Sequence, residues 1–196
     1  DVVLSTPVLQ ALRRAYPQAF LAMMVRPVCR ELIEGNPHVN EVLVYDKDGR
    51  HRGVLGTVRF ARSLRAHRFD TALALHPSNR SHWIPWLAGI PARIGYDRKS
   101  AWLLTCRIAH RKQEGARHEA DYTLDLVRAL GVEPLPPQPH VPINPELDRR
   151  VARRLQGAGI ASEDLLVAIH PSASGLSKRW KAERFAQVAD RLIESH

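Results

Sequence analysis

Short apolar segments alternate with amphipathic segments along most of this chain, and this alternation limits the folds that it can adopt. Continuous apolar runs predict buried strands at 20–25, 41–45, 71–75 and 92–95. Helical spacing, with start and stop signals, predicts helices over 6–15, 27–34, 54–67, 83–88 and 120–130. Strands that alternate with helices usually form a parallel sheet that carries helices on both faces. The predicted fold class is therefore α/β.

A proline-rich stretch interrupts the alternation and predicts a boundary between two domains. Residues 132–145 hold six prolines, which remove backbone donors and stiffen the chain. We therefore predict an N-terminal domain at 1–131, a linker at 132–145 and the start of a second α/β domain at 146–196. That second domain should contain a helix over 146–155, a strand over 165–169 and a helix over 185–193.

The two ends of the sequence suggest a longer protein. The chain begins with Asp1 rather than methionine, and the first helical pattern follows almost at once. It ends inside the last amphipathic pattern. We therefore expect a piece of a longer protein, with the second domain incomplete.

The most informative single segment follows the predicted strand at 165–169. It reads His-Pro-Ser-Ala-Ser-Gly-Leu-Ser-Lys-Arg-Trp from position 170. In a strand–loop–helix unit, the loop amides and the helix N-terminus point at one spot and favour an anion. Ser172, Ser174 and Gly175 are small enough for a phosphate to approach the backbone, and Lys178 adds a positive charge. The segment predicts a diphosphate site. The alternative is a surface loop with solvated basic residues, and we expect Trp180 to pack in the core behind the loop.

The chain is strongly basic, with a formal net charge of +9 and an isoelectric point near 10.2. This balance favours an acidic partner such as nucleic acid, anionic lipid or a phosphorylated sugar. The two cysteines, Cys29 and Cys106, share no short motif and are expected to be reduced thiols. No pair of histidines has metal-ligand spacing near a carboxylate or cysteine, so we predict no metal site.

Three stretches resemble glycosyltransferase family 9, the ADP-heptose:lipopolysaccharide heptosyltransferases. The first is the opening, Asp-Val-Val-Leu-Ser-Thr-Pro at 1–7, with the helix that follows it. The second extends from Phe69-Asp70 to Ala92-Arg93-Ile94-Gly95, and the third is the segment at 170–180. Their order matches that of the family, and together they span the chain. Pro27-Val28-Cys29-Arg30 and Lys178-Arg179-Trp180 make the heptosyltransferase II type the most similar.

The resemblance implies a GT-B fold of two Rossmann-like domains with parallel sheets, the second truncated in this chain. The N-terminal domain would bind the acceptor, and the C-terminal domain would bind the sugar nucleotide. The implied reaction moves heptose from ADP-heptose to the inner core of lipopolysaccharide, with inversion and without a metal or cofactor. The implied partners are an ADP-sugar donor and an acidic lipopolysaccharide acceptor, reached by peripheral association with the cytoplasmic face of the inner membrane.

Family roles carry over to a few positions of this chain. Asp1 matches the general base of the family, although the residue taken alone reads as a helix N-cap. Lys178 matches the lysine that holds the donor diphosphate. Ser172 and Ser174 match the small polar loop less closely, because the length of that loop varies within the family. Gly175 belongs to the same predicted phosphate loop.

Acceptor binding is expected at the loops that follow the strands, because parallel sheets bind ligands at their carboxyl ends. The candidates for contact with the acceptor are His76, Arg80, Arg93 and Arg98. A guanidinium suits the planar or tetrahedral anions of the acceptor, phosphate or Kdo carboxylate. Two of these residues have structural alternatives, since His76 could cap a helix and Arg93 could pair with a structural carboxylate.

Two other functions fit parts of the sequence. A sugar-nucleotide 2-epimerase could use the same fold, but it needs further acid and base residues. A nucleic-acid-binding module would explain the charge. The sparse aromatic residues lie mostly at core-like positions and no known RNA or DNA motif occurs, so we expect no nucleic-acid partner.

Overall fold

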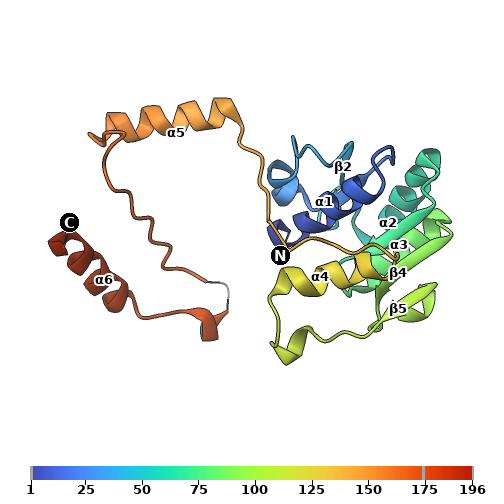
Figure 1. Cartoon of the computed structure of the whole chain (residues 1–196). Coiled ribbons are helices and arrows are strands. Elements are labelled where there is room, and N and C mark those ends of the chain that lie inside the picture. The colour runs from blue at the N-terminus through green and yellow to red at the C-terminus, as the bar shows by residue number, and fades with distance from the viewer. Residues whose placement is uncertain (1, 174, 196) are drawn as a thin grey trace. The chain divides into compact units, whose positions relative to one another are not determined.

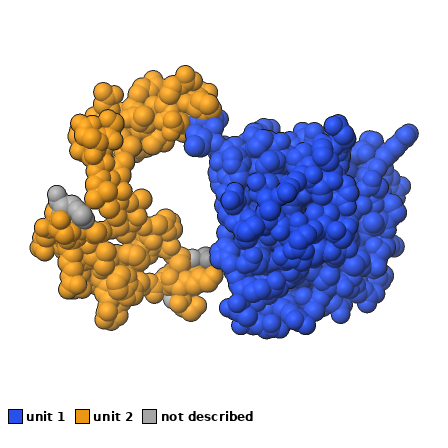
Figure 2. All heavy atoms as spheres, in the orientation of Figure 1, with its two compact units in different colours: residues 1–144 blue, residues 145–196 orange. Residues whose placement is uncertain are grey.

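The computed structural model describes residues 2–173 and 175–195 and divides into two compact units (Figure 2). Unit 1 is Asp1–Asn144 and unit 2 is Pro145–His196. The assignment of acceptor binding to the first predicted domain and donor binding to the second stays a prediction.

Unit 1 is a mixed α/β structure in which every strand pairing is parallel, as the alternation predicts (Figure 1). Its strands are β1 Ala22–Val25, β2 Glu41–Val44, β3 Thr71–Ala74, β4 Ala92–Tyr96 and β5 Cys106–Ile108. Its α-helices are α1 Thr6–Ala15, α2 Gly53–Ser63, α3 Asn79–Ala88 and α4 Glu119–Arg128. Short 3₁₀ helices are η1 Val3–Ser5, η2 Pro27–Leu32, η3 Leu64–His67, η4 Ala101–Leu103 and η5 Lys112–Glu114.

Apolar side chains leave the strands on both faces, which explains why the strands read as continuous apolar runs. On one face, Met24, Leu43 and Ala72 pack against a cluster that contains Phe60 of α2 and Ile84 of α3. The other face carries alternate strand residues and is covered by α1 and α4. The side chains in that layer are Val8, Leu9, Met23, Val25, Val42, Leu73, Leu124 and Val127.

The strands form two sheets rather than the single sheet that the sequence predicts. One sheet contains β1 and β2, and the other has the order β3-β4-β5. Leu75, directly after β3, contacts the core cluster of β1 and the two clusters beneath α4. The two sheets therefore share a hydrophobic core, although no backbone ladder joins them within the described chain.

Local capping explains where α3 begins and ends. The hydroxyl of Ser78 accepts a hydrogen bond from the amide of Ser81, and the Ser81 hydroxyl accepts one from the amide of Ser78. This reciprocal pair is a capping box, and it starts the helix at Asn79, four residues before the predicted start. Gly89 ends the helix with a φ of 79°, a left-handed conformation that glycine adopts without strain.

Two other local predictions need correction. The segment from Pro27 is the 3₁₀ helix η2, not an α-helix, although Gly35 beyond it does have a positive φ of 86°. Strand β5 was not predicted, because three residues give too short a pattern to distinguish a strand from a loop. It is held by parallel pairing with β4, in which Gly95 lies opposite Arg107.

The proline-rich stretch is part of unit 1 as far as Asn144. The amide of His140 donates a hydrogen bond to the Thr6 hydroxyl at 2.9 Å, which ties this stretch to the start of α1. Residues 132–136 and α1 line a cavity of about 290 Å³. The prolines thus lie along the surface of the first unit.

Unit 2 consists of α5 Pro145–Gly157, the 3₁₀ helix η6 Leu176–Lys178 and α6 Ala182–Ser195. The helices are close to those predicted, but the predicted strand at 165–169 is wrong, because these residues form no ladder. Leu165 is 67% exposed, and its apolar neighbours Leu166, Val167 and Ile169 are also exposed. A parallel strand needs a hydrogen-bonded neighbour, and the described part of unit 2 supplies none.

The buried His82 of α3 allows the packing of unit 1 to be tested. Its side chain is fully buried, and neither ring nitrogen makes a hydrogen bond of normal geometry. Burial lowers the pKa of His82 from its ordinary value of 6.5, and the backbone of Ser100 opposes this shift in part. The folded state disfavours the charged imidazole. The stability that unit 1 gains from a neutral His82 is therefore fully present above pH 6.5, the ordinary pKa, and is lost as the pH falls through the lower pKa of the folded state.

We predict that His82→Leu lowers the acid sensitivity of unit 1. Between pH 7.5 and 5, the unfolding free energy of the variant should fall less than that of the wild type. One proton limits this difference to about 1.4 kcal/mol per pH unit. Urea unfolding, followed by tryptophan fluorescence, measures it. The matched control is His76→Leu, the same change at an exposed position; an equal effect of both variants contradicts the prediction.

Candidate functional site

The loops after the parallel strands lie at the carboxyl edge of each sheet, where ligands of α/β proteins bind. Two contacts join neighbouring loops at this edge. Arg26, after β1, forms an ion pair of 2.9 Å with Asp48, after β2. The Ser100 hydroxyl, after β4, donates a hydrogen bond of 3.1 Å to the side-chain oxygen of Asn79, after β3. Both pairs place loops from adjacent strands side by side.

His76 lies on the β3–α3 connection, and Arg80 follows it at the start of α3. The carbonyl of His76 accepts hydrogen bonds from the Ser78 amide and the Ser81 hydroxyl, so the capping box fixes the backbone here. The His76 side chain is exposed. Arg80 lies in the first turn of α3 and is exposed as well. These two residues keep their side chains available at the carboxyl edge, as the acceptor hypothesis requires.

Arg98 and Arg93 differ in their surroundings. Arg98 follows β4 at the same edge, is exposed, and donates a hydrogen bond of 3.3 Å to the Gln113 side chain. The guanidinium of Arg93 instead donates to the backbone carbonyls of Ile90, Pro91 and Leu103. Its side chain joins the start of β4 to η4. The geometry therefore gives Arg93 a structural role through carbonyl oxygens, not through the carboxylate that the sequence suggested as an alternative.

A third basic loop at the carboxyl edge was not singled out from the sequence. It spans 46–53, between β2 and α2, and carries Lys47, Arg50 and Arg52. The Asp46 carboxylate accepts the backbone amides of Asp48, Gly49 and Arg50 at 2.9–3.3 Å. These bonds hold the pKa of Asp46 below its ordinary value. Three cations within six residues, between a strand and a helix, were the signal that could have identified this loop.

The predicted donor loop is held by contacts within itself. The Arg179 Nε donates to the carbonyl of Ala173 at 2.7 Å, and the Lys178 amide donates to the carbonyl of Gly175 at 3.0 Å. The Ser172 hydroxyl lies 3.4 Å from the His170 Nε2. Ser172, Gly175 and Lys178 lie in one short segment before α6, whereas Ser174 lies outside the described residues.

The end of this loop differs from the prediction at Trp180. We expected its ring to pack in a core, but it is 48% exposed. It contacts Phe185 of α6 edge-on, with ring centroids 5.3 Å apart, and the Arg184 guanidinium lies 5.9 Å from its centroid. No core covers the ring within the described part of unit 2, since α5 and α6 contain no buried residue.

Asp1, the predicted base, also lies outside the described residues. The residues that follow it are fixed to unit 1 through η1. The Leu4 carbonyl accepts a hydrogen bond from the Thr123 hydroxyl of α4 at 3.3 Å. Thr6, at the start of α1, donates its hydroxyl to the Val3 carbonyl at 2.7 Å. The roles of Asp1 as base or cap stay predictions.

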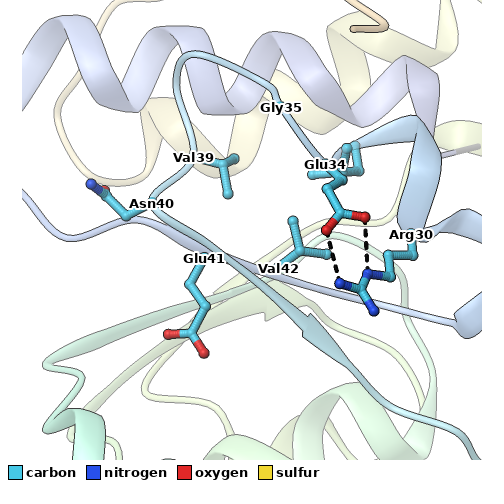
Figure 3. A pocket seen from close by; sticks show the side chains of 8 residues that line it. Arg30, Glu34, Gly35, Val39, Asn40, Glu41 and Val42 are labelled. Carbon is cyan, nitrogen blue, oxygen red and sulfur yellow. Dashed lines mark hydrogen bonds and ion pairs between the residues drawn. The ribbon is translucent and has the colours of Figure 1, made fainter. Parts of the chain in front are cut away.

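A surface cavity of about 310 Å³ lies at the other end of the strands (Figure 3). Its lining residues come from the connection between β1 and β2 and include Glu41 and Val42, the first residues of β2. Its Arg30 and Glu34 side chains form two hydrogen bonds, at 3.0 and 2.8 Å. Because these charges neutralise each other and Glu41 and Val42 begin β2 rather than end it, we do not assign the cavity to the candidate site.

No helix among residues 2–173 and 175–195 is long and apolar enough to span a bilayer. In the same part of the chain, no group of three or more His, Cys, Asp or Glu side chains could hold a metal ion.

Comparison with known proteins identifies the family. The sequence profile described as glycosyltransferase family 9 (heptosyltransferase) matches residues 57–196. The chain belongs to this family. The matched residues include the candidate positions on β3–α3 and β4 as well as the loop before α6.

Named relatives of this family 9 chain agree with the profile. It is 25% identical over 199 residues to lipopolysaccharide heptosyltransferase 2 of Escherichia coli K12. That alignment covers 99% of this chain and 57% of the relative. It is 28% identical over 203 residues to lipopolysaccharide heptosyltransferase 2 of Salmonella typhimurium, in an alignment that covers 98% of this chain and 57% of the relative. The chain thus spans little more than half the length of these curated relatives.

Solved structures place the family 9 chain in the GT-B fold. A family 9 glycosyl transferase from Veillonella parvula aligns with a TM-score of 0.88 and 30% identity, covering 97% of this chain and 56% of that one. The E. coli ADP-heptose LPS heptosyltransferase II aligns with a TM-score of 0.75 and 26% identity, covering 100% and 58%. The predicted α/β fold with parallel sheets is confirmed.

The hydrogen bonds that hold the basic loop at 46–53 can be tested by substitution of Asp46. We predict that Asp46→Ala speeds hydrogen exchange at the amides of residues 48–50 by roughly two- to tenfold, because each loses its acceptor. Hydrogen exchange followed by mass spectrometry measures this change. The control is Asp48→Ala, which removes only the exposed ion pair with Arg26. Unchanged exchange in Asp46→Ala would mean that the loop is held by other contacts.

Proposed function

We propose that the protein to which this chain belongs transfers heptose from ADP-heptose to the inner core of lipopolysaccharide. The single observation that carries the proposal is the family 9 heptosyltransferase match over residues 57–196. The named relatives support it, since those of E. coli and Salmonella are lipopolysaccharide heptosyltransferases. The match favours a transferase over a 2-epimerase or a nucleic-acid-binding module.

The proposed chemistry is an inverting displacement. A carboxylate accepts the proton of the acceptor hydroxyl while that oxygen attacks the anomeric carbon, and the bond to the nucleoside diphosphate breaks. We assign the base to Asp1. Negative charge grows on the leaving diphosphate, and a fixed cation stabilises it in the transition state. We assign that cation to Lys178, so that the reaction proceeds without a metal or cofactor.

The geometry of the loop before α6 supports the second assignment. Lys178 ends η6 with an exposed side chain, in a segment closed by the Arg179–Ala173 contact. Hydrogen bonds within the loop hold its backbone, and the exposed Lys178 side chain is accessible to a diphosphate. Ser172, Gly175 and Ser174 are proposed to line the same anion site.

The acceptor is proposed to bind at the carboxyl edge of unit 1. His76, Arg80 and Arg98 are exposed there, on loops joined through the Ser100–Asn79 hydrogen bond. Guanidinium groups bind phosphate and carboxylate strongly, and both groups fit an acidic lipopolysaccharide core. The protein is proposed to act at the cytoplasmic face of the inner membrane, with peripheral attachment.

Lys178→Ala should weaken donor use in the full-length protein. The donor KM should rise and kcat should fall, because the lysine contacts the diphosphate both before and during bond breaking. A lost charge-assisted hydrogen bond corresponds to roughly 10- to 100-fold in kcat/KM. Steady-state transfer from ADP-heptose to truncated lipopolysaccharide measures it. Lys181→Ala, an exposed lysine three residues later, is the matched control; equal losses in the two variants would reject a specific role for Lys178.

Asp1→Asn should separate the base from the cap. Asparagine keeps the size and capping ability of the side chain but cannot accept the proton. We expect donor affinity to stay near that of the wild type and kcat to fall by roughly 10²–10⁴-fold. The measurement is the same assay in the full-length protein, with a thermal melt of each variant. A near-normal kcat with a lowered melting temperature would identify Asp1 as a structural cap.

A further inference from the structure

Three tryptophans form an exposed cluster on unit 1. Trp83 and Trp86 lie on α3, and Trp102 lies in η4. The Trp83 ring packs edge-on against both others, with centroid distances of 5.6 Å to Trp86 and 5.8 Å to Trp102. Trp102 is nevertheless 62% exposed and Trp86 is 44% exposed. These edge-on contacts orient the rings without removing the outer two from water.

The cluster is a built feature rather than a chance exposure of side chains. Trp83 is partly buried, and its indole nitrogen donates to the Ser100 hydroxyl at 3.1 Å. That hydroxyl donates in turn to Asn79, so a chain of hydrogen bonds anchors the central ring between α3 and the loop after β4. In the described chain, the indole nitrogens of Trp86 and Trp102 make no hydrogen bond, which leaves two polar donors at the edge of an apolar surface.

The sequence around the cluster is basic. Residues 76–103 contain four Lys or Arg residues and a single acid, Asp97. Arg93 is engaged by backbone carbonyls, but Arg80, Arg98 and Lys99 are exposed. Arg80 is three residues before Trp83, so the two lie on one side of α3. Lys99 precedes the Ser100 anchor directly.

This combination indicates the chemistry of the partner. An indole has an apolar body and a polar N–H, and such rings concentrate at the level of lipid headgroups. Cations beside them attract the phosphates of anionic lipids. We propose that Trp86, Trp102, Arg80, Arg98 and Lys99 form a docking surface for an anionic lipid bilayer. The inference rests on the proposed function only in that a lipid-borne acceptor would be reached from such a surface.

Binding of the full-length protein to lipid vesicles tests the proposal. The probe is vesicles of phosphatidylethanolamine and phosphatidylglycerol, with pure phosphatidylcholine vesicles for comparison. The wild type should sediment with the anionic vesicles, and its tryptophan emission should shift to the blue and be quenched by brominated lipid. Trp102→Ala should lower the vesicle partition coefficient by about tenfold, since one exposed ring is lost from the contact with lipid. Lys99→Ala should weaken it by about fivefold.

The matched control is Trp180→Ala, another half-exposed tryptophan that lies in unit 2. It should leave vesicle binding unchanged, and circular dichroism should show that all variants fold. Equal loss in Trp102→Ala and Trp180→Ala overturns the proposal, as does salt-sensitive DNA binding that disappears in Trp102→Ala while vesicle binding does not. If Trp102→Ala fails to fold, absence of quenching by brominated lipid in the wild type overturns it.

The test is independent of catalysis. Vesicle binding uses neither donor nor acceptor, so its failure leaves the proposed heptosyl transfer untouched. Conversely, vesicle binding that depends on Trp102, together with no heptose transfer, would support the docking surface and contradict the proposed function.

Discussion

Burial of the strands on both faces is the constraint on which the rest of unit 1 depends. Met24 and Leu43 face the layer of α2 and α3, whereas Met23 and Val42 face the layer of α1. A parallel strand covered on both sides has no solvated face, so its polar groups must appear where it ends. This is why His76 and Arg98 lie in loops at the carboxyl edge, with Arg80 in the first turn of the helix that follows.

These loops are ordered by short-range hydrogen bonds rather than by a core. Ser78 and Ser81 cap α3 and fix the backbone of His76, while the Asp46 carboxylate gathers three amides of the next basic loop. Such local bonds set the backbone and leave the cationic ends of Arg50 and Arg80 exposed. The edge thus combines a fixed backbone with long charged side chains, which suits a large anionic partner.

The same basic residue type has different roles at neighbouring positions. Arg93 donates to three backbone carbonyls and links β4 to η4, whereas Arg98, five residues later, is exposed at the carboxyl edge. Arg80 lies on the helix that carries Trp83 and Trp86, and Lys99 directly precedes Ser100, which anchors Trp83. Net charge alone therefore says little about function here; the neighbours of each guanidinium decide whether it supports the fold or is free for an anion.

The sequence by itself determined the α/β class, the parallel pairing and most helix and strand positions, because period and apolar runs are local properties. It also identified the family through ordered motifs, including the loop before α6. Only the tertiary structure decided the division into two sheets, the strand β5 and the capture of Arg93 by carbonyls, since these depend on how the backbone places hydrogen-bond partners and not on the pattern of residue types. The run at 165–169 shows the same limit: its apolar pattern favours a strand, but a strand exists only where a neighbouring strand pairs with it. The exposure of Trp86 and Trp102 could not be predicted for a similar reason, because burial depends on which surfaces cover a ring.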